Sequence, residues 1–110
     1  MRFRYAVNGL KFSFTAEHSI WIHLSATILV VILSITKRVT LIESVALTFT
    51  IGSVWTAELF NTAIEKLADK VCNDYNVQIK IIKDLSAAAV LVTSVTALIT
   101  GLFIFIPKFS

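Results

Sequence analysis

Residues 85–106 read LSAAAVLVTSVTALITGLFIFI, an apolar run without a single charged side chain. Crossing the ~30 Å hydrocarbon core of a bilayer takes about 20 apolar residues in a helix. Within hydrocarbon, only helices and closed barrels satisfy every backbone polar group. A barrel strand shows about 10 residues of alternating polarity, which this run does not. The segment therefore predicts a membrane-spanning helix.

Two further apolar runs, at residues 20–35 and 41–57, predict two more membrane helices. The composition agrees, because 56% of residues are hydrophobic and 15% are charged, against roughly 25% charged in soluble domains. We predict one all-α membrane domain over residues 1–110, with three membrane helices at about 18–36, 41–70 and 84–106. Polar connections are expected at 36–40 and 71–83, and Pro107 is expected to end the last helix.

Residues 1–16 predict a different kind of helix. Phe3, Val7, Leu10 and Phe14 recur at helical spacing, and polar residues follow one position later, so this amphipathic helix is suited to lie on the membrane surface. With three crossings, the N-terminus and the connection at 71–83 share one side of the membrane. Seven basic residues on that side, against three on the other, predict a cytoplasmic N-terminus in a multi-pass protein of the bacterial cytoplasmic membrane.

The net charge of +3 is too small to indicate a nucleic-acid partner, and the single cysteine, Cys72, allows neither a disulfide framework nor a cysteine-based metal site. With only three glycines, the chain has neither a P-loop nor a kinase glycine-rich loop. If the chain binds ATP, it does so by neither of these two common devices.

The polar positions of the second long helix carry the chemistry. At 100° per residue they fall within about 80° and form one stripe ~16 Å long, made of Glu58, Asn61, Glu65 and Asp69. A carboxylate inside a membrane helix costs ~2.5–3.5 kcal/mol on insertion scales, and stacked like charges repel. A divalent cation with hard oxygen ligands, shared with a phosphate-bearing substrate, resolves both costs. The alternative is a solvated helix face, which suits Asp69 better than Glu58.

Two other clusters are expected at the same membrane face. Glu17 stands at the start of the first membrane helix, and Lys83-Asp84 stands at the start of the third, where Asp84 is also a suitable helix cap. His18 and His23 have two interpretations, as metal ligands or as residues that pack and hydrogen-bond between helices. Two rival functions stay open: a small ion or proton carrier, and a structural membrane subunit. A carrier needs ionisable residues near mid-bilayer in several helices, and the third helix has none.

The stretch Glu58-Leu59-Phe60-Asn61-Thr62-Ala63-Ile64-Glu65, with Asp69 four residues on, resembles the signature of the bacterial integral membrane diacylglycerol and undecaprenol kinases. Asn8-Gly9-Leu10-Lys11 leading to Glu17, Asp74-Tyr75 and Lys83-Asp84 extend the resemblance over nearly the whole chain. The resemblance implies an ATP- and Mg²⁺-dependent lipid kinase that assembles as a homotrimer with active sites at subunit contacts.

The resemblance also implies residue roles. Glu58 would be the general base toward the lipid hydroxyl, and Asn61 would orient that carboxylate or the substrate. Glu17 and Glu65 would hold Mg²⁺ with the ATP phosphates. The nucleotide site would further be lined by Tyr5, Asp69, Asp74, Tyr75, Lys83 and Asp84. Ser86-Ala87 departs from the Gly-Ser of some members, and Ile22-His23 looks like the undecaprenol branch, so the choice between diacylglycerol and undecaprenol stays open.

Overall fold

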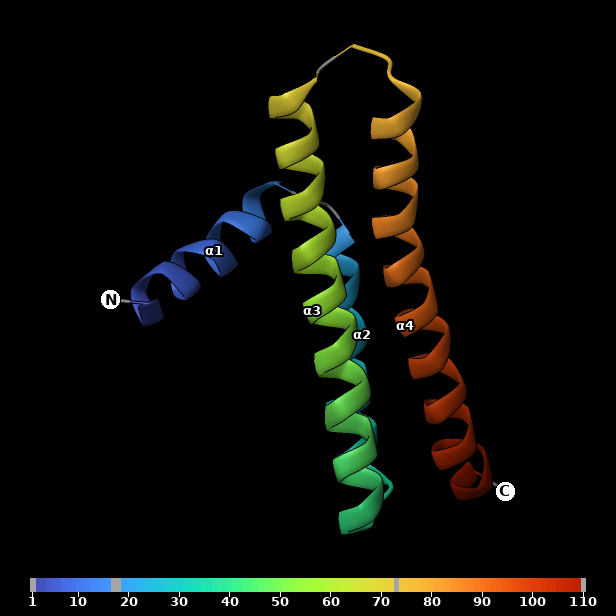
Figure 1. Cartoon of the computed structure of the whole chain (residues 1–110). Helices are drawn as coiled ribbons and strands as arrows, with labels where there is room; N and C mark the ends of the chain where they lie inside the picture. The colour runs from blue at the N-terminus through green and yellow to red at the C-terminus, as the bar shows by residue number, and fades with distance from the viewer. Residues whose placement is uncertain (1, 17–18, 73, 110) are drawn as a thin grey trace.

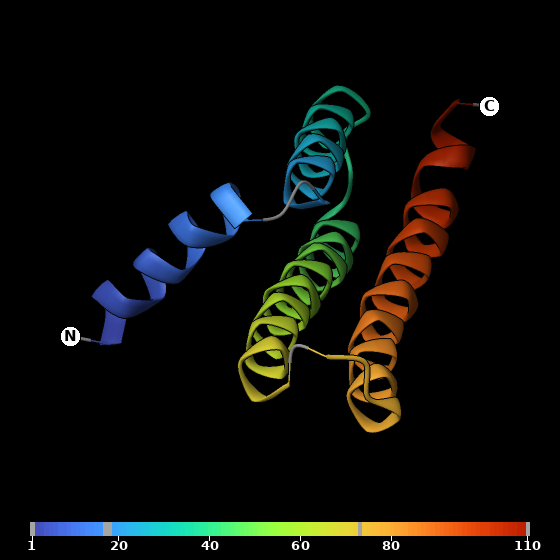
Figure 2. The same ribbon diagram turned by 90° about the horizontal axis from the view of Figure 1, so that it is seen from above.

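The computed structural model describes residues 2–16, 19–72 and 74–109, and its secondary structure there is all helical. The helices are, in chain order, α1 (Arg2–Ala16), α2 (Ser19–Thr36), α3 (Leu41–Val71) and α4 (Val77–Phe109). Figure 1 shows α3 and α4 side by side with opposite chain directions, while α1 turns out to one side. Viewed from above, α2 lies against α3, and α1 extends away from the bundle (Figure 2). The predicted all-α class is confirmed.

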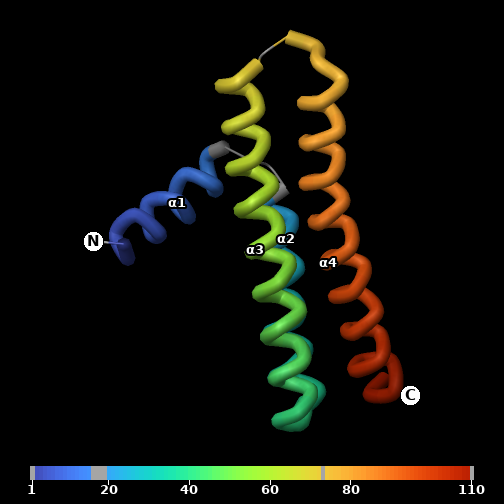
Figure 3. Tube along the Cα trace, viewed as in Figure 1, coloured from blue at the N-terminus to red at the C-terminus, as the bar shows by residue number. Residues whose placement is uncertain are grey.

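The connection between α3 and α4 is shorter than the sequence indicated. Residues 71–83 were expected to be a polar connection, but α3 ends at Val71 and α4 already begins at Val77 (Figure 3). The side-chain Oδ1 of Asn76 accepts hydrogen bonds from the backbone N–H groups of Gln78 at 2.8 Å and Ile79 at 3.2 Å, which is an N-cap. Apolar runs mark the part of a helix that lies in hydrocarbon, so the polar first turns of α4 escaped the prediction.

The opposite end of the bundle is joined by polar contacts. Thr40 caps α3: its Oγ1 accepts a hydrogen bond from the Glu43 N–H at 3.2 Å, and Glu43 Oε1 accepts one from the Thr40 N–H at 2.9 Å. Glu43 also lies 2.9 Å from the Nζ of Lys108 at the end of α4. Pro107 does not stop α4, which continues to Phe109, because a proline so near the end disrupts only the last turn.

The apolar core lies toward this same end. Leu47 packs there against Ile104 and Phe105, with Val30 and Leu33 around them. Many other large apolar side chains stay exposed along α2, α3 and α4, which suits helices surrounded by lipid. Within the described residues, α4 alone is long and apolar enough to span a membrane, and α1 and α2 reach that criterion when counted as one broken segment.

Candidate active site

The predicted stripe on α3 runs from a buried end to an exposed end. Glu58 is 3% exposed, Asn61 and Glu65 are half-buried, and Asp69 is exposed. The buried residues Leu47 and Val54 lie on the same face of α3, so the stripe continues the face that packs inside the bundle. The polar stripe therefore leads from the interior of the bundle to its surface.

Glu58 contacts α2. Its Oε2 lies 3.2 Å from Nε2 of His23, and the two side chains are 4% and 16% exposed. A buried carboxylate without hydrogen-bond partners is strongly unfavourable. The His23 contact meets part of that requirement, and it brings a residue of α2 into the site.

Asn61 contacts α4 instead. The buried hydroxyl of Ser86 donates a hydrogen bond to Asn61 Oδ1 at 2.6 Å, and Asn61 Nδ2 donates one to Glu65 Oε2 at 3.0 Å. The hydroxyl also lies 3.0 Å from the carbonyl oxygen of Lys83. This chain of contacts fixes the amide of Asn61 with its nitrogen toward the carboxylate of Glu65.

The exposed end of the stripe is held by ion pairs. Lys83 Nζ lies 2.6 Å from Asp69 Oδ1 and so joins α4 to α3, while Lys80 Nζ lies 2.6 Å from Asp84 Oδ2 within α4. Lys83 precedes the apolar run of α4, and the hydrogen bond that it donates to Asp69 raises the pKa of this lysine above its ordinary value. Lys83 therefore stays charged, as one half of an ion pair that joins α4 to α3.

A depression of about 430 Å³ opens at this end between α3, the connection and α4. Five of the predicted nucleotide-site residues line it: Asp69, Asp74, Tyr75, Lys83 and Asp84. It also takes in Cys72, Asn76 and Lys80. Lys80 and Lys83 offer positive charge for phosphate groups. The exposed ring of Tyr75 offers a flat surface on which a nucleobase can stack.

One predicted residue of the described structure does not join this cluster. Tyr5 is exposed on α1, which extends away from the bundle (Figure 2). Glu17, the other predicted Mg²⁺ ligand, lies outside the described residues, as does His18. Across the described residues, no group of three or more histidine, cysteine, aspartate or glutamate side chains gathers as a metal site. Glu65 still fits Mg²⁺, because proteins usually hold that ion by one or two carboxylates together with substrate phosphates.

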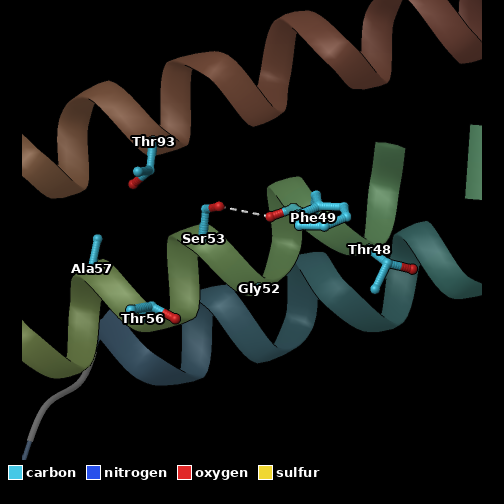
Figure 4. Close-up of a pocket in the computed structure, with 7 residues that line it drawn as sticks. All are labelled: Thr48, Phe49, Gly52, Ser53, Thr56, Ala57 and Thr93. Carbon is cyan, nitrogen blue, oxygen red and sulfur yellow. Dashed lines mark hydrogen bonds between the residues drawn. The ribbon is translucent and has the colours of Figure 1, made fainter. Parts of the chain in front are cut away.

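A second hollow, of about 520 Å³, lies along the middle of α3, beside α4 (Figure 4). Its lining is Thr48, Phe49, Gly52, Ser53, Thr56 and Ala57 of α3 with Thr93 of α4. The hydroxyls of Thr48, Ser53 and Thr93 donate to carbonyl oxygens of their own helices, so they offer little to a polar ligand. This hollow is the larger of the two, but it lies about 180° around α3 from the stripe and is not part of the candidate active site.

The sequence profile of the prokaryotic diacylglycerol kinases matches residues 4–105 of the chain, a span that contains the stripe, the depression, all of α2 and α3 and most of α1 and α4. The chain belongs to the prokaryotic diacylglycerol kinase family. An undecaprenol kinase of Bacillus subtilis is 33% identical over 106 residues, which cover 96% of this chain and 86% of that protein. A diacylglycerol kinase of Synechocystis is 32% identical over 106 residues, which cover 96% of this chain and 61% of that protein.

As a member of the prokaryotic diacylglycerol kinase family, the protein is a lipid kinase and a membrane protein, and membership implies that ATP is used. The family resemblance and the enzyme class expected from the sequence are confirmed. The two rivals, a carrier and a structural subunit, are thereby set aside.

Two residues of the candidate site were not assigned from the sequence. The sequence predicts His23 as a metal ligand or as a residue that packs and hydrogen-bonds between helices, and its contact with Glu58 confirms the second interpretation without the sequence having named that partner. Ser86 is noted there only as a departure from a family pattern. Both bond to the stripe, one from α2 and the other from α4. A signal existed for each, because a polar side chain inside or beside an apolar run needs a partner on another helix.

Proposed function

We propose that the protein transfers the γ-phosphoryl group of Mg²⁺-ATP to the hydroxyl of a membrane lipid, either diacylglycerol, giving phosphatidic acid, or undecaprenol, giving undecaprenyl phosphate. One observation carries the proposal. Glu58 is a buried carboxylate at one end of a polar stripe, and the other end of that stripe lines a lysine-bearing depression. A base for a lipid hydroxyl and a site for a nucleotide are thus joined on one helix face.

In this mechanism Glu58 accepts the proton of the lipid hydroxyl while the hydroxyl oxygen forms its bond to the γ-phosphorus. The bond from that phosphorus to the bridging oxygen of ADP breaks, and ADP leaves with the electron pair. Asn61 orients the reacting groups, and Lys83 neutralises phosphate charge in the depression. Catalysis of this kind is mainly positioning and charge stabilisation.

Glu65, together with Glu17, would hold the Mg²⁺ ion. Bound Mg²⁺ would supply positive charge that offsets the negative charge of the ATP phosphates. Glu65 already accepts a hydrogen bond from Asn61 at 3.0 Å, which holds its carboxylate in one orientation on α3. Asp69, Asp74, Tyr75 and Asp84 would surround the nucleotide, and Tyr5 would approach it from α1, in this subunit or in a neighbouring one.

The membrane arrangement is also a proposal. We place α2, α3 and α4 across the bacterial cytoplasmic membrane, with α1 on its cytoplasmic surface. The distribution of Lys and Arg supports a cytoplasmic N-terminus, since α1, the last turns of α3 and the first turns of α4 together carry seven of the ten basic residues. ATP would then reach the depression directly from the cytosol.

We further propose a homotrimer. The hollow on the outer face of α3 supports it, because Gly52, Ser53 and Ala57 there leave room for a neighbouring helix to approach closely. Three membrane helices alone also expose much of their apolar surface and part of the polar stripe. A second copy seated in the hollow would pack against α3 without covering Glu58.

The test is a transfer assay with [γ-³²P]ATP on diacylglycerol and undecaprenol, run side by side in mixed micelles. The Glu58→Gln variant is expected to lose labelling of the preferred lipid by about 100-fold or more. Glu43→Gln is the matched control, since it removes the same charge at the other end of α3, where Glu43 serves as part of a helix cap. Full labelling by Glu58→Gln would remove Glu58 from the mechanism. One relative is named as an undecaprenol kinase and the other as a diacylglycerol kinase, and their identities to this chain are similar. The assay therefore decides which lipid this protein prefers.

A further inference from the structure

We propose that His23 is a positioning residue: its ring N–H donates to Oε2 of Glu58 and holds that carboxylate in the orientation that meets the lipid hydroxyl. The inference rests on the proposed role of Glu58 as base. It adds a residue from α2 to a site otherwise built on α3 and α4.

The geometry of the pair carries the proposal. His23 Nε2 lies 3.2 Å from Glu58 Oε2, and both side chains are largely withdrawn from the surface, at 16% and 4% exposure. The two residues come from different helices, so their contact fixes the carboxylate relative to α2 as well as α3. If the Glu58 carboxylate rotated about its last side-chain bond, its lone pairs would no longer point at the lipid hydroxyl. A general base therefore needs its side-chain torsion to be fixed.

The other members of the stripe have contacts in a different direction. Glu65 accepts a hydrogen bond from Asn61, and Asp69 pairs with Lys83 of α4. Those contacts hold the nucleotide end of the stripe, whereas the His23 contact holds the lipid end. The division matches the two substrates, one from water and one from the bilayer.

The chemistry of the pair favours donation over metal binding. Within the described residues, no third histidine, cysteine or carboxylate joins His23 and Glu58. Mg²⁺ prefers oxygen ligands, whereas a neutral imidazole with a proton on Nε2 is a good donor to a carboxylate.

Three substitutions at His23 separate the donor from the ring. In His23→Gln the amide nitrogen reaches about as far as the imidazole Nε2 and can still donate. In His23→Asn the amide stops one bond short, at the place of Nδ1, and His23→Leu has no donor. We expect kcat to fall about 100-fold in His23→Leu and His23→Asn, with KM for ATP unchanged, while His23→Gln keeps most of the wild-type kcat. Ser25→Ala is the control on α2, because Ser25 is exposed and bonds only within its own helix.

The measurements are initial rates of lipid phosphorylation and the oligomeric state of each purified variant. Wild-type kcat in His23→Leu would overturn the proposal. So would a His23→Gln variant as slow as His23→Leu, since the ring itself would then be required. If His23→Leu does not assemble, the comparison of the glutamine and asparagine variants decides. Adding His23→Leu to Glu58→Gln is expected to cause no further loss, and an added loss would show that His23 acts elsewhere. Activity of Glu58→Gln alone tests the base separately.

Discussion

Replacing Ser86 by alanine removes one hydroxyl from the middle of the candidate site. Ser86 is 7% exposed, and its Oγ lies 2.6 Å from Asn61 Oδ1. With that donor present, the amide oxygen of Asn61 points to α4 and the amide nitrogen points to Glu65 at 3.0 Å. Without the Ser86 hydroxyl, nothing from α4 selects the amide oxygen of Asn61 over its nitrogen. The carboxylate of Glu65, the proposed Mg²⁺ ligand, then loses the hydrogen bond that fixes its orientation.

The size of the effect follows from this one hydrogen bond. Side-chain hydrogen bonds between membrane helices contribute about 0.6 kcal/mol on average and up to about 1.7 kcal/mol. At about 1.4 kcal/mol for each factor of ten, the loss corresponds to about 3- to 16-fold. We therefore expect kcat/KM for ATP to fall by that factor in Ser86→Ala. This is well below the loss of about 100-fold or more expected for Glu58→Gln.

The assay is lipid phosphorylation at varied ATP, with Thr93→Val as the control. Thr93 lies two turns further along α4, and its hydroxyl bonds only to carbonyl oxygens of Ala89 and Val90 in the same helix. Its replacement is expected to leave kcat/KM unchanged. Once Asn61 is alanine, Ser86→Ala should cost nothing more, because the hydroxyl then has no amide to orient. An equal loss in both backgrounds would refute the reasoning.

Three further outcomes are expected. Glu65→Gln should raise the Mg²⁺ concentration for half-maximal activity by about 10- to 100-fold, and an unchanged magnesium dependence would contradict the ligand role. Gly52→Leu should weaken the proposed trimer, as measured by cross-linking, since a Cβ added at Gly52 meets nothing within 4 Å in its own chain and the new side chain would enter the hollow; Gly101→Leu, whose Cβ is equally open, should not weaken it, and an intact trimer in Gly52→Leu would exclude the hollow as a contact. Cys72, the single cysteine, should resist a membrane-impermeant maleimide in intact cells and react after permeabilisation; labelling from outside would reverse the proposed topology.

Local patterns were sufficient for the helices and for the stripe. The long apolar run of α4 and the 100° spacing of Glu58, Asn61 and Glu65 depend only on residues within one helix. The start of α4 was missed because the Asn76 cap and the turns after it are polar. Helical spacing alone also cannot say which neighbour a side chain will meet. Glu58 turned out to contact α2 and Asn61 to contact α4, a division set by how three helices pack.

The position of Tyr5 shows the same limit. Its place beside a nucleotide was implied by family likeness, and α1 carries it away from the depression within one chain. Such a residue can reach a site only through an arrangement between copies or a different placement of α1. Neither is encoded in the local sequence, so its role stays a prediction.

The fall in solvent exposure from Asp69 to Glu58 means that, in the proposed mechanism, the two reactants never have to share a solvent. The lipid alcohol can stay in the bilayer and the nucleotide can stay in water. Only the phosphoryl group that is transferred crosses the boundary between the two phases. Apparent affinity for the alcohol then depends on its mole fraction in the membrane or micelle, whereas affinity for the nucleotide does not. Diluting the lipid alcohol with inert detergent should therefore lower the rate, because the mole fraction of the alcohol in the micelle falls. The KM for ATP should stay the same.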